Sequence, residues 1–349
     1  MGKNKVDAYS VLKGISIFLV VCIHVLYKFH GADKPKLLEA LNYITGFAVP
    51  LFMIIGGFFL TTKLEHCTED IKLYFKHLLK RILIPYYIFC LILTLFRFLT
   101  NKKLFLYPFL LIDAGTHGLY FIIIYVYSYT ISGLLFYLIS TFNKFDKKII
   151  ISIIIPLISF LSFPISNWLS RYAPDNSVVI GLTLISYFTA GFPIAVFCRK
   201  ITPRNFLYKM NILLAIICFL FIYTGILYLF RTFYAKFPIF SAQPSIFVLI
   251  YSICIFLILF IILNEIAFFT VIGKKILFDR FGNESLFIFY IHPYFIYLLP
   301  DIFNMIYLKN TINSNLFVFP WVFFSYLIAL ISLKIYDILP VKIQKIFSR

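Results

Sequence analysis

Residues 10–28 read SVLKGISIFLVVCIHVLYK, an apolar run that contains Lys13 near its start and His24 near its end. As an α-helix, a run of this length covers about 28 Å, close to the roughly 30 Å of hydrocarbon in a bilayer. Apolar and polar residues do not alternate along it, as they would in the strand of a membrane barrel. The run therefore predicts a membrane-spanning helix.

Further apolar runs of similar length follow along the chain. They cover residues 41–61, 82–100, 118–140, 149–166, 179–198, 211–230, 244–264, 285–304 and 317–336. Together with 10–28 they predict an all-α polytopic membrane protein with about ten transmembrane helices, forming a single domain over 1–349. The stretch 101–117 is apolar but short, and we expect a re-entrant or interfacial segment there.

The composition excludes the main classes of soluble protein. Of the 349 residues, 62% are hydrophobic and 13% are charged, whereas soluble chains average about 45–50% and about 25%. A soluble enzyme, a disordered chain, a disulfide-stapled secreted domain and a nucleic-acid-binding domain are therefore excluded. The six cysteines show no CxxC spacing, and the histidines show no metal-ligand spacing, so we expect neither a metal site nor a tightly bound cofactor.

The net charge of +18 predicts how the chain crosses the membrane. If the N-terminus is cytoplasmic, 22 of the 32 Lys and Arg residues lie on the inner side. They occupy the N-terminus, Lys13, and the segments near 63–81, 141–148, 199–210, 265–284 and 334–349. Basic residues accumulate on the cytoplasmic side of membrane proteins, so we expect both termini to be cytoplasmic. No A-x-A cleavage site follows the first run, which we interpret as a retained helix.

Lys13 and His24 are the first candidates for a functional site. They are eleven residues apart, which in a helix places them about 20° apart on one face and about 16 Å apart along the axis. Ionisable groups within a bilayer are costly and therefore indicate function. A long ligand with an anionic head and a reactive tail could bridge them. Alternatively, Lys13 snorkels to the inner surface and His24 bonds a neighbouring helix.

His292 is the second candidate. It lies seven residues after Ser285, on the same helical face, and Pro293 is expected to kink the helix that carries both. His292 could orient His24 or the acceptor, or it could only form an interhelical hydrogen bond. For His117 we expect an interfacial role, and Arg97 either snorkels or binds an anionic glycan carrier.

Four motifs in order resemble the membrane acyltransferase-3 family. They are residues 12–24, residues 50–60 (PLFMIIGGFFL), His117 followed by 118–121 (GLYF), and 282–285 (GNES) followed by 290–293 (YIHP). The resemblance extends over about 7–335. The chain departs from the family pattern at Gly56, where Ser is frequent, and at Tyr120, where Trp is frequent. Residues 76–85 (KHLLKRILIP) keep the basic character of an R-x-x-R element but lack the motif itself.

The resemblance implies transfer of an acyl group, usually acetyl from acetyl-CoA, to a hydroxyl of a surface or lipid-linked polysaccharide. The family's essential histidine corresponds to His24, and its basic partner corresponds to Lys13. Histidine is the commonest general base, and an acyl-His24 intermediate is an alternative to direct transfer.

The remaining site residues divide between the two substrates. We expect His292 to assist catalysis and Lys13, Lys76, Lys80 and Arg81 to bind the phosphates of acyl-CoA. His117, Tyr120, Ser285 and Arg97 are expected to support the acceptor site.

The expected partners are acyl-CoA, a surface or lipid-linked glycan, membrane lipid and polysaccharide-synthesis proteins, but no nucleic acid. Without an extra soluble domain, the chain resembles the short O-acetyltransferases of the intercellular adhesin and of enterobacterial common antigen. We expect a multi-pass protein of the bacterial plasma membrane. A polysaccharide exporter or flippase without acyl-transfer activity is the alternative, because ten helices and a basic inner face suit it too.

Overall fold

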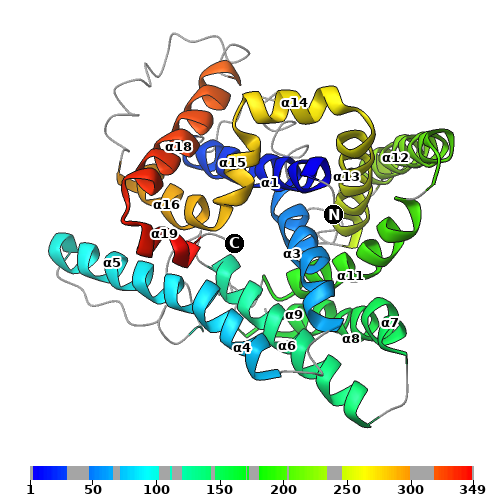
Figure 1. The fold of residues 1–349 in the computed structure, drawn as a ribbon, viewed down its shortest axis with the longest axis horizontal. Coiled ribbons are helices and arrows are strands. Elements are labelled where there is room, and N and C mark those ends of the chain that lie inside the picture. Colours follow the sequence, from blue (N-terminus) through cyan, green and yellow to red (C-terminus); the bar gives the residue numbers. More distant parts are fainter. Residues whose placement is uncertain are drawn as a thin grey trace. The chain divides into compact units, whose positions relative to one another are not determined.

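The computed structural model describes residues 3–29, 47–65, 71–101, 111, 120–142, 146–169, 171–172, 181–202, 204–233, 246–298 and 318–347. These residues are almost entirely helical and contain no strand, which confirms the all-α prediction for the described part of the chain (Figure 1). They form two compact units, Met1–Phe52 with Leu259–Arg349, and Met53–Ile258. We call these the terminal unit and the central unit.

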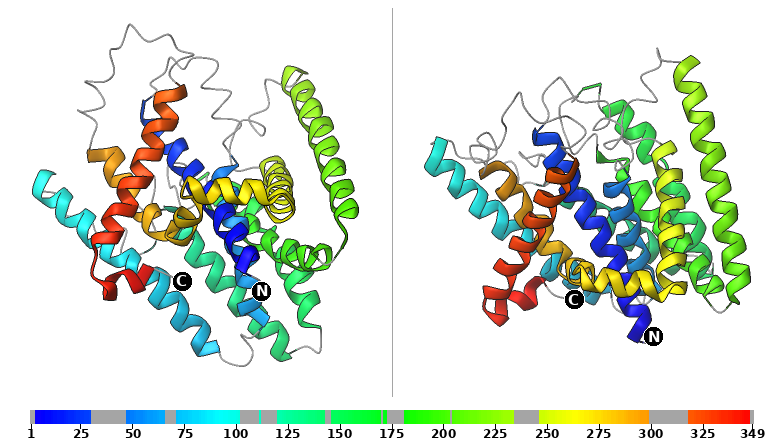
Figure 2. Two further views of the ribbon diagram at one scale, coloured as in Figure 1. Left: turned by 45° about the horizontal axis from the view of Figure 1, so that its top comes forward. Right: turned by 90° about the horizontal axis from the view of Figure 1, so that it is seen from above.

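The terminal unit contains the predicted site helix. It consists of α1 (Lys3–Phe29), α14 (Ala267–Lys275), α15 (Phe278–Asn283), α16 (Ser285–Leu298), α18 (Val318–Ile338) and α19 (Val341–Phe347). It also holds the start of α3 (Ala48–Glu65) and the end of α13 (Ile246–Glu265). Helix α1 packs against α15, α16 and α18, and α18 runs beside α1 in each view (Figures 1 and 2).

The central unit holds the rest of α3 and α13 and the helices between them. These are α4 (Ile71–Leu78), the π-helical turn η1 (Leu79–Leu83), α5 (Ile84–Asn101), α6 (Tyr120–Phe142), α7 (Lys147–Ile149), the π-helical turn η3 (Ile150–Ile154), α8 (Ile155–Ser159), α9 (Ser162–Leu169), α11 (Leu184–Ile201) and α12 (Phe206–Phe233). Helices α6, α8 and α9 pack against α11, whose side chains are mostly buried.

Six helical segments of the described chain are long and apolar enough to cross a membrane: Ala8–Val25, Phe121–Thr141, Lys147–Leu169, Leu184–Ile201, Phe206–Tyr223 and Val248–Glu265. Each overlaps a predicted span. Apart from a turn at Phe47, the described residues of the other four predicted spans are helical, as parts of α3, of η1 and α5, of α16 and of α18. The chain is therefore a multi-pass membrane protein, while the count of ten spans and the cytoplasmic termini stay predictions.

Each π-helical turn is followed by one residue and then by a proline. The backbone N–H of Ile84 donates to the carbonyl of Leu79, and Pro85 follows. The N–H of Ile155 donates to the carbonyl of Ile150, and Pro156 follows. A proline ring clashes with the carbonyl four residues earlier and has no N–H to donate to it. Widening the preceding turn by one residue relieves that clash without ending the helix.

Segments that the sequence predicts only as inner connections also contain helix. Residues 71–81 form α4 and the first part of η1, and α12 begins at Phe206. Within 265–284 the chain turns at Ile266, which is extended, and forms α14 and then α15. These short helices escape a search for apolar runs because only part of each surface is apolar.

Candidate active site

His24 of α1 and His292 of α16 form a hydrogen-bonded pair. His24 Nδ1 lies 2.8 Å from His292 Nε2, and the two rings stack with their centroids 4.9 Å apart at an interplanar angle of 25°. His24 is partly buried, whereas His292 is fully buried. The two residues that the sequence suggests for catalysis thus meet in the terminal unit, although 268 positions separate them.

The partners of His292 decide where the protons of the neutral pair lie. Its Nδ1 is 3.0 Å from the backbone carbonyl oxygen of Ile288. A carbonyl oxygen can only accept, so Nδ1 of His292 carries the proton and its Nε2 carries the lone pair. His24 Nδ1 then donates to His292 Nε2, which leaves the lone pair of the His24 ring on Nε2. This nitrogen is the basic atom of the pair.

Pro293 gives a physical reason for the His–Pro sequence in α16. It lies inside the helix, where it has no N–H to donate to the carbonyl of Phe289, four residues earlier. His292, the residue before Pro293, directs its ring N–H back to the carbonyl of Ile288, the residue before Phe289.

Two glycines determine the axial position of α16 relative to α1. A Cβ at Gly14 would overlap the carbonyl oxygen of Phe278, and a Cβ at Gly282 would overlap that of Ser10. The backbones of α1 and α15 are therefore in direct contact. The Ser10 hydroxyl also donates to Asn283 Oδ1 at 2.9 Å. Since α16 begins two residues after Asn283, this contact fixes the register that places His292 opposite His24.

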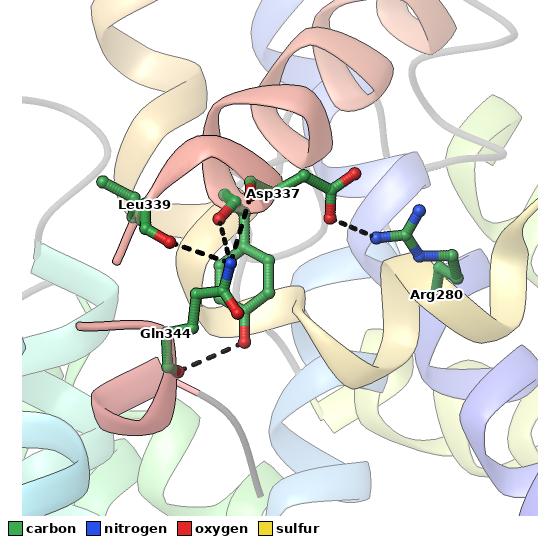
Figure 3. A network of polar contacts seen from close by, with 5 residues as sticks. Arg280, Asp337, Leu339 and Gln344 are labelled. Carbon is green, nitrogen blue, oxygen red and sulfur yellow. Dashed lines mark hydrogen bonds and ion pairs between the residues drawn. The ribbon is translucent and has the colours of Figure 1, made fainter. Parts of the chain in front are cut away.

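Lys13 lies in a cluster of charged residues at the start of α1. It is partly buried and interacts electrostatically with Glu284, which also interacts with Arg280. Burial raises the pKa of Glu284, whereas a hydrogen bond with the Tyr336 side chain and, to a smaller extent, the two cations act in the opposite direction. Arg280 Nη2 in turn lies 2.6 Å from Asp337 Oδ1 (Figure 3). The basic group at this end of α1 therefore has an acidic neighbour that sequence spacing alone does not reveal.

The structure brings four of the predicted site residues into the terminal unit: Lys13, His24, Ser285 and His292. Ser285 is fully buried.

The other predicted site residues lie elsewhere. Lys76, Lys80 and Arg81 belong to the central unit, where the two lysines are exposed and Arg81 is partly buried. His117 lies outside the described residues, as do the side chains of Tyr120 and Arg97.

Sequence reasoning missed three contributors to this site: Gly14, Gly282 and Asn283. Both glycines stand inside the motifs quoted above, and a glycine within a helix is a signal of close helix contact. The serine–asparagine bond had no sequence signal, because it joins residues 273 positions apart. Among the described residues, no group of three or more His, Cys, Asp and Glu side chains could hold a metal ion.

One comparison with known proteins gives a match. The model of a protein family described as "Acyltransferase domain" matches residues 6–335, nearly the whole chain, including both His24 and His292. No curated protein and no solved structure matches the chain significantly.

Proposed function

Because the chain belongs to the acyltransferase-3 family and is an acyltransferase, we propose that it transfers an acetyl group from cytoplasmic acetyl-CoA to a hydroxyl of a surface or lipid-linked polysaccharide. We place this reaction in the bacterial plasma membrane. The single observation that carries the mechanism is the 2.8 Å bond between His24 Nδ1 and His292 Nε2. It leaves a basic nitrogen on a helix that the family match covers.

In the proposed reaction, His24 Nε2 takes the proton of the acceptor hydroxyl while the hydroxyl oxygen attacks the thioester carbonyl. The new C–O bond forms and the C–S bond breaks. The departing thiolate takes the proton back from His24, so the products are an O-acyl ester and the free thiol of CoA. General-base catalysis of this kind contributes about 10²–10⁴-fold.

His292 acts as a positioning residue in this mechanism. Its Nε2 accepts the Nδ1–H of His24, which holds the ring in one tautomer and orientation. When His24 takes up the substrate proton, the same bond stabilises the imidazolium, as the third group of a catalytic triad does. A neutral imidazole serves here where many triads use a carboxylate.

In this proposal, one set of residues binds the acyl-CoA donor and another set binds the glycan acceptor. Lys13 lies eleven residues before His24 on α1, and Lys76, Lys80 and Arg81 complete the cations for the CoA phosphates. For the glycan we assign supporting roles to His117, Tyr120 and Arg97, whereas Ser285, which the sequence suggests for the acceptor, is assigned to the donor instead. Membrane lipid and polysaccharide-synthesis proteins are the proposed partners.

The test is mass spectrometry of surface glycans from a deletion strain that carries either the wild-type protein or His24→Ala. We expect the variant to be produced normally, to export glycan, and to leave it without O-acyl groups. Full O-acylation by a normally produced His24→Ala protein would overturn the proposal. Loss of glycan export with intact O-acylation would instead favour the alternative function, a polysaccharide exporter or flippase.

A further inference from the structure

Three buried polar atoms stand out in the terminal unit. Within its described residues, the buried side-chain oxygens without a hydrogen-bond partner are Ser16 Oγ, Glu284 Oε2 and Ser285 Oγ. Both serines are fully buried. A buried helical serine ordinarily donates to the carbonyl four residues earlier, as Ser332 of α18 does to Ile328 at 2.8 Å.

Contacts between α1 and residues 283–292 occur at two levels along α1. Near the start of α1, Ser10 bonds Asn283 and Lys13 interacts with Glu284, while further along His24 bonds His292. Helices α1 and α16 therefore run in the same direction between these two levels.

Both serines lie on the inner side of the histidine pair. Ser16 lies eight residues before His24, and Ser285 lies seven residues before His292. At 1.5 Å per residue, the two hydroxyls are about 12 Å and about 10 Å from the histidine pair along the helix axes.

An unpartnered buried hydroxyl is costly, so such atoms mark a place where a polar group of a ligand can bind. The donor in the proposed function carries such groups. Between its thioester and its phosphates, acyl-CoA has a pantetheine arm with two amides and one hydroxyl. An extended chain advances about 3.5 Å for every three bonds. The second amide and its neighbouring hydroxyl, seven to ten bonds from the sulfur, therefore lie about 8–12 Å from it.

Resting on the proposed function, we propose that Ser16 and Ser285 bind the second amide of the pantetheine arm, and that Glu284 Oε2 accepts a hydrogen bond from the neighbouring hydroxyl. The match of lengths places the thioester at the histidine pair when the amide lies between the serines. The site would select donors that carry a complete arm over short thioesters.

The test compares two ligands that differ only in the arm. CoA carries the nucleotide, its phosphates and the arm, whereas 3′-phosphoadenosine 5′-diphosphate carries the nucleotide and phosphates alone. Binding of each is measured by calorimetry to the full-length protein in detergent, for the wild type, Ser16→Ala, Ser285→Ala and the control Ser332→Ala. We expect each of the first two variants to raise the Kd for CoA about three- to ten-fold. The Kd for the diphosphate stays unchanged, and the control changes neither.

Equal weakening of both ligands by Ser16→Ala and Ser285→Ala would overturn this inference, and so would an unchanged Kd for CoA. A wild-type protein that binds neither ligand would instead contradict the proposed donor. The unliganded variants should melt at or above the wild-type temperature, because the hydroxyls they lose have no partner. If an alanine variant is not produced, the cysteine variant gives the same comparison with a weaker donor.

Discussion

The proton shared by His24 and His292 determines which nitrogen of the pair is basic. The carbonyl of Ile288 fixes the tautomer of His292, and that tautomer fixes the one of His24. Each side chain alone is an ordinary histidine in an apolar helix, and the sequence leaves open whether it only bonds a neighbour. Their mutual contact gives one of them a directed lone pair, which is what a general base requires.

Replacing His292 tests the positioning role. In His292→Ala, His24 loses its acceptor and its fixed tautomer, so we expect kcat for acyl transfer to fall about 10²-fold. The KM for acyl-CoA should stay within about two-fold, because His292 touches no part of the donor in this mechanism. Steady-state kinetics in proteoliposomes with acetyl-CoA measures both constants.

His292→Gln serves as the matched comparison. Its amide oxygen can accept the Nδ1–H of His24, so this variant should recover part of the kcat that His292→Ala loses. If both variants show the same kcat, or if KM rises as much as kcat falls, His292 has no positioning role.

At the scale of helices, α1 and α15 approach until their backbones touch. Gly14 and Gly282 permit this contact, because a methyl group at either position would meet a backbone carbonyl oxygen. A backbone carbonyl cannot move aside as a flexible side chain can. Helix α16 follows α15 directly, so the contact controls the position of His292 as well as the stability of the unit.

Gly14→Ala should therefore lower both stability and activity. Overpacking of this kind costs about 1–3 kcal/mol, which exceeds the helix-propensity gain of about 1 kcal/mol from replacing Gly by Ala. We expect a lower Tm in detergent and a loss of acyl transfer. Gly273→Ala is the control, since the atoms nearest to its Cβ belong to the Val11 side chain and not to a backbone. Equal effects of the two substitutions would refute the backbone-contact argument.

The side chain of Gln344 in α19 caps the C-terminal end of α18. Gln344 Nε2 lies 3.0 Å from the carbonyl oxygens of both Tyr336 and Leu339 and 3.3 Å from that of Asp337 (Figure 3). The last carbonyls of a helix have no partner within it, so one amide side chain satisfies several of them. Phe347 then packs its ring on Phe287 of α16, with the centroids 5.1 Å apart.

Gln344→Ala should weaken the contact between α19 and the end of α18. Removing these bonds costs about 1–2 kcal/mol, so we expect α19 to become accessible to carboxypeptidase at lower protease concentrations than in the wild type. Limited proteolysis with detection of the C-terminus by mass spectrometry measures this. Lys334→Ala, an exposed change on α18, should leave the cleavage pattern as it is. Wild-type resistance in Gln344→Ala would contradict the role given to the amide.

At the scale of the whole molecule, the apolar content and the basic segments act together. The 62% hydrophobic content puts the helices in the membrane, and the positions of 22 of the 32 basic residues predict which side faces the cytoplasm. The described helices support a multi-pass protein.

Reporter fusions measure that topology. We expect green fluorescent protein to fluoresce at both the N-terminus and the C-terminus, and alkaline phosphatase to be inactive there. Phosphatase fused after each predicted span should alternate between inactive and active, ending at the tenth span. An active phosphatase at the C-terminus would show that the number of crossings is odd and would refute the ten-span prediction.

The sequence by itself determined that this protein is a helical membrane protein, and that Lys13 and His24 share a helix face. Both follow from local quantities, because the cost of leaving water adds up along the chain and helical geometry repeats every 3.6 residues. Only the tertiary structure decided that His24 bonds His292, that Gly14 and Gly282 let two backbones touch, and that two serines stay without partners. These depend on packing between segments far apart in the sequence, where a shift of one helical turn would separate every pair.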